Sequence, residues 1–169
     1  MTKKWSWLLI PLGGLLVWHL TKEKPPEGAA VTIVVRDSEG NIVEEHSPLD
    51  LYEGKSYTAT ASVTNKTTAD GFAYEADFNI NIFGYVVAGG TSYLLFGNEK
   101  SLGALQHFAA NETLSFTQAF TVPLGWYGLS GEICCAVLAP GNILVATARV
   151  GITLKALAKT YAASVTLTV

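Results

Sequence analysis

Residues 55–64, with the sequence KSYTATASVT, decide the fold class of this 169-residue chain. Tyr57, Ala59, Ala61 and Val63 occupy every second position, and serine or threonine fills the positions between them. Because neighbouring side chains of an extended chain point to opposite faces, this alternation predicts a β-strand with one buried and one solvated face. No other stretch of the sequence shows the pattern of a half-buried strand so clearly.

Extended segments recur at regular spacing along the rest of the chain. A hairpin is predicted from 31–35 to 42–45, because Gly40 lies in a polar turn between two apolar runs. Only 102–107 and 156–163 could hold a helical turn. Short strands at this spacing predict an all-β fold, an immunoglobulin-like or jelly-roll-type β-sandwich. The further predicted strands are 74–83, 91–96, 112–121, 130–138, 143–154 and 164–169.

Three stretches carry a resemblance to a known family. Residues 53–65 resemble the second strand of immunoglobulin-like bacterial and archaeal surface modules of the CARDB type, in which a glycine precedes an alternating strand ending in Val-x-Asn. Residues 109–116 are similar to the start of a later strand of such modules, and 126–135 to their passage from Gly-Tyr into a strand. The resemblance covers 31–150 and departs at the long apolar, glycine-rich stretch 84–105 and at the extra C-terminal strand. It implies a tethered, non-catalytic surface module.

The N-terminal segment predicts one hydrophobic helix ahead of the sandwich. Residues 5–20 contain no Asp, Glu, Lys or Arg, and as a helix they would span about 24 Å, which approaches the thickness of a bilayer core if the flanking residues reach the interface. We predict an anchor helix at 1–20, a linker at 21–30 and the sandwich at 31–169. The residues expected to contact the membrane are Trp5, Trp7, Leu8, Leu9, Ile10, Leu12, Leu15, Leu16, Val17 and Trp18.

Two alternatives to an anchor remain open. The segment could be a signal peptide, although no small-residue cleavage motif stands beside the apolar run, or an arm packed inside a protein assembly. Lys3 and Lys4 give a slight bias that favours an N-terminus in the cytoplasm. The domain would then lie on the extracytoplasmic side, at a cell surface or on a virion.

Composition restricts the partners. Hydrophobic residues make up 49% of the chain and charged residues 15%, whereas charged residues account for about 25% of a typical soluble domain. A surface with so few charges favours contact with other protein copies or shielding of another kind. The net charge of -3, without a basic cluster, excludes nucleic acid as the expected partner.

The two cysteines, Cys134 and Cys135, are adjacent and cannot close a long loop within one chain. In a strand their side chains would point to opposite faces, which predicts one buried and one exposed thiol. Two reduced cysteines, a vicinal disulfide and an intermolecular bridge all remain open. His19, His46 and His107 are scattered, so neither they nor the cysteines predict a metal site.

Other candidate sites have ordinary structural explanations beside the functional ones. The aromatic residues Tyr85, Tyr93, Phe96, Trp126 and Tyr127 could form a partner surface or lie in the core. The alternating oxygen ligands at 37–41 could bind calcium or close a solvated turn. The sequences at 65–67 and 111–113 fit the N-glycosylation pattern. No catalytic or cofactor motif is present, since the chain has no nucleophile elbow, phosphate loop or dinucleotide fingerprint.

Two functional hypotheses follow. The first is a non-enzymatic, membrane-anchored structural subunit that associates with copies of itself or with other structural proteins in a surface layer, filament or virion. The second is a tethered extracytoplasmic module that binds or adheres to a protein or glycan. An enzyme is not expected, because the sequence offers no nucleophile–base pair and no metal set.

Overall fold

The computed structural model describes residues 27–43, 48–98 and 103–157. Every regular element there is a strand, so the predicted all-β class is confirmed. No described helix has the length and hydropathy needed to cross a membrane. The predicted anchor helix at 1–20 and the predicted strand at 164–169 lie outside the described residues. The strands are β1 Ala29–Asp37, β2 Leu49–Tyr52, β3 Ser56–Asn65, β4 Thr68–Ala69, β5 Phe72–Ala73, β6 Ala76–Ala88, β7 Thr91–Phe96, β8 Leu105–Phe108, β9 Thr113–Thr121, β10 Ser130–Ala139 and β11 Ile143–Lys155.

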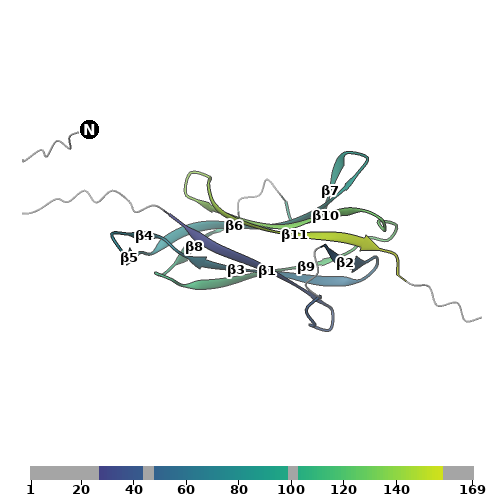
Figure 1. Cartoon of the computed structure of the whole chain (residues 1–169), viewed down its shortest axis with the longest axis horizontal. Helices are drawn as coiled ribbons and strands as arrows, with labels where there is room; N and C mark the ends of the chain where they lie inside the picture. Colours follow the sequence, from purple (N-terminus) through teal and green to yellow (C-terminus); the bar gives the residue numbers. More distant parts are fainter. Residues whose placement is uncertain (1–26, 44–47, 99–102, 158–169) are drawn as a thin grey trace, which may run out of the picture.

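Two main sheets pack face to face, and β4 and β5 form a separate two-stranded sheet (Figure 1). The smaller sheet has the order β1-β3-β9, and the larger has the order β2-β11-β10-β6-β7, with β8 also paired to β6. All pairings are antiparallel except that of β2 with β11. The described chain enters at one end of the long axis, at β1, and leaves at the other end, after β11 (Figure 1).

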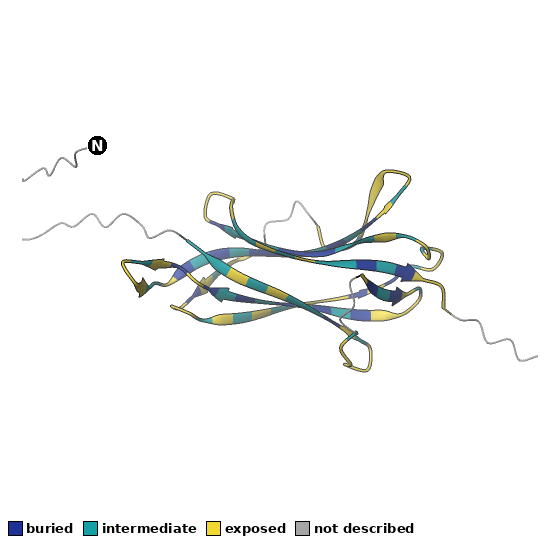
Figure 2. Cartoon of the chain, viewed as in Figure 1, coloured by how far each residue is buried: buried dark blue, intermediate teal, exposed yellow. Residues whose placement is uncertain are grey.

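The core lies between the sheets and follows the alternation seen in the sequence (Figure 2). Tyr57, Ala59, Ala61 and Val63 of β3 are all buried, while the residues between them point outward. Small side chains on this strand leave room for aromatic rings from its neighbours. The Phe96 and Phe120 rings stack with centroids 4.4 Å apart, and those of Phe78 and Phe108 meet edge to face at 5.4 Å. Full burial of a phenylalanine stabilises the fold by about 1.5–3 kcal/mol.

The predicted hairpin after β1 is present in a reduced form. Within the described residues its second arm is a single bridge between Arg36 and Ile42. Asp37 closes the turn: its Oδ1 accepts hydrogen bonds from the backbone N–H groups of Glu39 and Asn41, each at 2.9 Å. The same carboxylate accepts a bond from the Asn41 side chain at 3.1 Å.

Two short strands correct the sequence prediction. The segment 102–107, which could have held a helical turn, forms none in its described part, since β8 is a strand paired with residues 76–79 of β6. Phe108 explains the difference, because this fully buried ring anchors the segment against Phe78 of β6. The second, β2, was not predicted, and it joins the sheet edge by parallel pairing with the end of β11.

The prediction of one exposed and one buried thiol is also wrong, because both cysteines are buried. Cys135 faces the core. Cys134 faces outward from the central strand β10, yet it is only 4% exposed, since it lies between Phe83 of β6 and Arg149 of β11. Burial raises the pKa of Cys135 to about 12, so its unreactive thiol form dominates at neutral pH.

Candidate functional site

The outer edge of β9 is the most unusual feature of the described surface. β9 is nine residues long, contains no charged residue or proline, and pairs with β3 without a register shift. It ends the smaller sheet, so no described strand pairs with its other side. Natural sheets usually protect a long edge strand with a charge, a proline or a bulge, because free N–H and C=O groups recruit further strands.

The register identifies which backbone groups face outward. Asn65 N–H donates to the Glu112 carbonyl at 2.9 Å and Val122 N–H to the Lys55 carbonyl at 3.0 Å. In this register the even-numbered residues of β9 bond to β3, so the N–H and C=O groups of its odd-numbered residues point to the open edge. The Gln118 side chain agrees with this assignment, since its Nε2 donates to the outward-facing Ala119 carbonyl at 3.0 Å.

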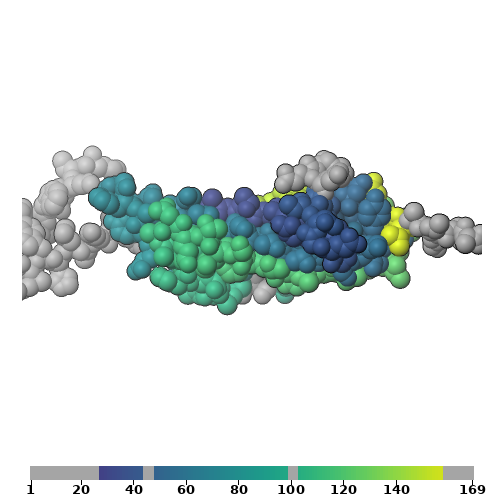
Figure 3. Space-filling model, turned by 90° about the horizontal axis from the view of Figure 1, so that it is seen from below, coloured from purple at the N-terminus to yellow at the C-terminus, as the bar shows by residue number. Residues whose placement is uncertain are grey.

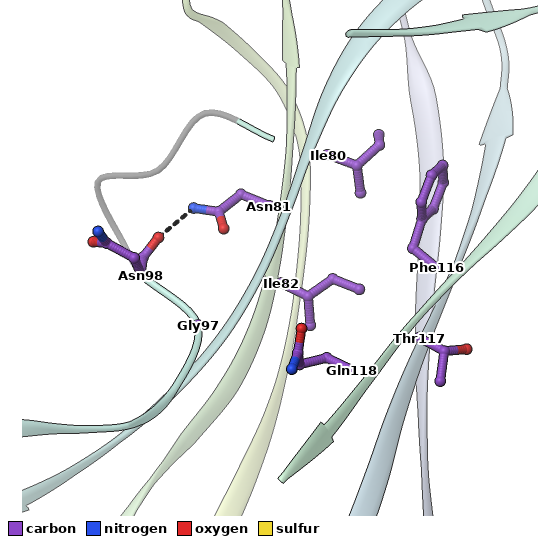
Figure 4. A pocket seen from close by; sticks show the side chains of 8 residues that line it. All are labelled: Ile80, Asn81, Ile82, Gly97, Asn98, Phe116, Thr117 and Gln118. Atoms are coloured by element: carbon purple, nitrogen blue, oxygen red, sulfur yellow. Dashed lines mark hydrogen bonds between the residues drawn. The ribbon is translucent and has the colours of Figure 1, made fainter. Parts of the chain in front are cut away.

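A cleft runs beside this edge, between β9 and β6. Ile80 and Ile82 point from β6 towards Phe116 on β9, whereas Asn81 points away and donates to the Asn98 carbonyl at 3.0 Å (Figure 4). The cleft has a volume of about 380 Å³. Its lining is completed by Gly97, Thr117 and Gln118. An apolar floor next to free backbone groups can accept an extended segment that brings both apolar side chains and hydrogen-bonding groups.

Serine and threonine side chains cover much of the outer face of the smaller sheet. Figure 3 views the molecule from that side. Four cross-strand pairs between β3 and β9 have their hydroxyl oxygens within 3.1 Å of each other. The odd-numbered residues of β9 form these pairs, which are the non-hydrogen-bonded backbone pairs, where side chains approach most closely. This face is therefore polar and solvated. The pairs are Ser56–Thr121, Thr60–Thr117, Ser62–Ser115 and Thr64–Thr113.

The structure separates the aromatic residues predicted as a partner surface. Tyr93 and Trp126 meet edge to face at 6.2 Å, and the neighbouring Tyr127 is 59% exposed. Phe96 instead lies in the core against Phe120. Tyr85 lies on the outer face of the larger sheet, where its hydroxyl donates to Glu132 at 2.8 Å. That hydrogen bond raises the pKa of Tyr85.

The turn that carries Trp126 and Tyr127 is fixed by backbone contacts. Gly125 N–H donates to the Glu53 carboxylate at 2.7 Å, and Gly128 N–H donates to the Leu154 carbonyl at 2.7 Å. The exposed Tyr127 therefore stands on a fixed backbone, while Trp126 is half-buried against the core. The sequence indicated the aromatic set but not which members share a surface.

The remaining polar candidates form small local structures. His107 Nδ1 lies 2.9 Å from Asp77 Oδ1, and its Nε2 lies 3.7 Å from Glu75. The hydrogen bond with Asp77 raises the pKa of His107. Among the described residues no three His, Cys, Asp or Glu side chains are placed to hold a metal ion. The carboxylate of Asp37 is engaged in its turn, and these bonds, led by that from the Asn41 side chain, lower its pKa.

The two glycosylation patterns have different structural positions. Asn65 is fully buried, and its Nδ2 donates to the carbonyls of Tyr74 at 2.7 Å and Ala109 at 3.0 Å. Its Oδ1 accepts from Thr67 N–H at 2.9 Å. Asn65 therefore closes the end of the sandwich and is inaccessible to glycosylation in the folded chain. Asn111 is exposed in the turn before β9.

Comparisons place the fold among known proteins. No protein-family model and no curated protein sequence matches the chain. It is similar in structure to the sporulation control protein Spo0M from Bacillus subtilis, with 15% identity, a TM-score of 0.45 and coverage of 77% of this chain and 50% of the other. The chain thus spans half the length of that protein.

Two further solved structures are matched over their whole length or nearly so. One is a Niemann-Pick type C2 protein from the Japanese carpenter ant, with 12% identity and a TM-score of 0.48. The match covers 83% of this chain and 100% of that protein. The other is a CARDB domain from Pyrococcus furiosus, with 13% identity and a TM-score of 0.38. The match covers 77% of this chain and 98% of that domain. A CARDB domain, the kind of module that the sequence resembles, is thus among the solved structures with a similar fold. The described part of the chain is an all-β sandwich.

Proposed function

We propose that this chain is a non-enzymatic structural subunit, tethered to a membrane by its N-terminal segment, that associates with copies of itself. The observation that carries the proposal is the free edge of β9. No described strand pairs with the outward backbone groups of this edge, of which the Ala119 carbonyl accepts a hydrogen bond from Gln118, and no charge on β9 opposes the arrival of another strand. The low charge of the whole chain supports the same proposal.

The oligomeric state of the full-length chain, extracted in a mild detergent, tests self-association. We expect oligomers by light scattering and regular particles by negative-stain microscopy. Gln118→Lys places a charge in the cleft beside the edge and should shift the distribution to monomer. Thr32→Lys, on the exposed face of β1, serves as a matched control and should leave the oligomers intact. A wild-type monomer at high protein concentration would refute self-association.

The tether has its own test. Leu15→Glu combined with Leu16→Glu places two charges in the apolar segment, and each charge at a bilayer centre costs about 2.5–3.5 kcal/mol on insertion scales. We expect the double variant to leave the membrane fraction. Unchanged fractionation would show that the segment is not a membrane anchor.

The alternative, a tethered binding module, is favoured by Tyr93, Trp126 and Tyr127. Tyr127 on the turn and Tyr93 on β7 are exposed, and Tyr93 packs against the half-buried Trp126. Exposed aromatic rings held in this way can stack on sugar rings or fill a partner's pocket. Retention of the full-length chain on insoluble cellulose or chitin, lost in Trp126→Ala and Tyr127→Ala but kept in Phe72→Ala, would support it. Phe72 is a suitable control because it is 70% exposed on a different hairpin.

A further inference from the structure

We infer that residues 164–169 of a neighbouring copy form the strand that pairs with β9 and fills the cleft beside it. The inference rests on the proposed self-association and identifies its contact. The segment SVTLTV was predicted as a strand from the sequence and lies outside the described residues. It has no charged residue, and Val165, Leu167 and Val169 alternate with Ser164, Thr166 and Thr168.

This alternation matches both surfaces next to β9. A strand in the plane of the smaller sheet presents one row of side chains to the core and the other to solvent. The valine and leucine row would meet the apolar floor formed by Ile80, Ile82 and Phe116. The serine and threonine row would extend the hydroxyl face, adding partners for residues such as Thr117. The reverse orientation would bury three hydroxyl groups against the apolar floor, which disfavours it.

The backbone fits as well as the side chains. The odd-numbered residues of β9 turn their N–H and C=O groups outward, so six further residues can pair with this edge once the Gln118 side chain releases the Ala119 carbonyl. Gln118 has its backbone turned to β3, and an incoming residue opposite it would form a non-hydrogen-bonded pair. Such pairs have a Cα separation of about 4.5 Å, within the range that a disulfide can bridge.

The end of β11 and the acceptor edge lie on different strands of the sandwich. The described chain leaves the sandwich after β11, whereas the acceptor edge belongs to β9 and β6, and the larger sheet places β10 between β11 and β6. The segment 156–163, eight residues long, reaches about 26 Å when extended. This segment could therefore reach the edge of its own chain or that of a neighbour; pairing with a neighbour makes a head-to-tail contact, which closes a ring or extends into a filament.

Cysteine cross-linking between two differently tagged full-length chains tests the inference. One chain carries Gln118→Cys, and the other carries a single cysteine at each position from 164 to 169 in turn. The native thiols of Cys134 and Cys135 are buried and contribute little background. After co-extraction in detergent and mild oxidation, we expect a disulfide-linked heterodimer whose yield alternates with every second position along 164–169. Substitutions at 165, 167 and 169 should give several-fold more product than those at 164, 166 and 168.

Each outcome is decisive. The period-two pattern between chains supports the inference. A chain carrying both Gln118→Cys and Leu167→Cys that cross-links only within a monomer would overturn it in favour of pairing within one chain. Intact oligomers without any cross-link to position 118 would overturn the inference and leave self-association standing. Monomers without cross-links would overturn both.

Discussion

Replacement of Asn65 by aspartate should destabilise the sandwich more than its small change in shape suggests. The side chain is fully buried, and two backbone carbonyls, of Tyr74 and Ala109, depend on its Nδ2 for their hydrogen bonds. Asn65→Asp replaces this donor by an oxygen. Each buried group left unsatisfied costs about 1–3 kcal/mol, and desolvation of the new charge adds to this, so we expect a loss of about 3–5 kcal/mol at pH 7.

The loss should depend on pH with a defined sign. Burial and the two facing carbonyls raise the folded-state pKa of the introduced carboxyl group above its unfolded value of about 3.9. Between the unfolded-state and folded-state pKa values, the folded state binds more protons than the unfolded state. Stability relative to wild type therefore falls by about 1.4 kcal/mol for each unit by which the pH rises. Below pH 4 the protonated group can still donate one hydrogen bond, and the deficit should be smallest there.

Urea unfolding of the full-length chain in mild detergent, followed by far-UV circular dichroism at several pH values, measures both effects. Asn111→Asp is the matched control, because Asn111 is exposed at a positive φ of 60° that aspartate also tolerates. We expect the control to change stability by less than about 0.5 kcal/mol. A loss below about 1 kcal/mol for Asn65→Asp at pH 7, or one independent of pH, would refute the argument.

Three further predictions concern separate parts of the fold. By NMR titration, His107 should have a pKa above 6.5, and this pKa should decrease in Asp77→Asn. The contribution of His107 to stability is full below its unfolded-state pKa and is lost as pH rises through its folded-state pKa. Equal His107 pKa values in the wild type and in Asp77→Asn would contradict this prediction. Gly131→Ala should lower the unfolding free energy by about 1–3 kcal/mol, because the new Cβ would lie against a carbonyl oxygen of β6. Gly28→Ala is the control, because its Cβ would make only ordinary contacts. Equal melting temperatures for the two variants would be inconsistent with this packing. Cys135 should react with a thiol reagent at pH 8 only after unfolding in urea, and rapid reaction of the native chain would show that its burial is transient.

Local pattern was sufficient to predict the long strands of this fold. In β3 the alternation of apolar residues with hydroxyl residues predicts the strand and its buried face, because successive side chains of a strand point to opposite faces of the sheet. β2 and β8 have only four residues each and are held by distant partners, so no local signal defines them. The burial of Cys134 depends on the cross-strand neighbours Phe83 and Arg149, which alternation along one strand does not reveal.

The candidate site was visible only in part. The sequence shows that residues 113–121 carry no charge, but strand order alone decides whether such a strand lies in the middle of a sheet or at its edge. The cleft likewise depends on where β7 and β8 pair along β6. The alternation of 164–169 is a sequence observation whose possible use appears only beside the β9 edge.

Comparison of the sheet edges strengthens the assignment of β9 as the contact. β2 and β8 are short, which limits pairing with another chain. β1 is as long as β9, but Val35 at the end of its outer side already accepts a hydrogen bond from Val43 at 2.9 Å, and the strand ends on the charged Arg36 and Asp37. The remaining edge, β7, is uncharged, but it has only six residues and pairs with β6 through a register shift. β9 alone among these described edges combines full length, regular register and a neutral strand. The long, uncharged edge of β9 therefore supports the proposed partner strand, whichever segment supplies that strand.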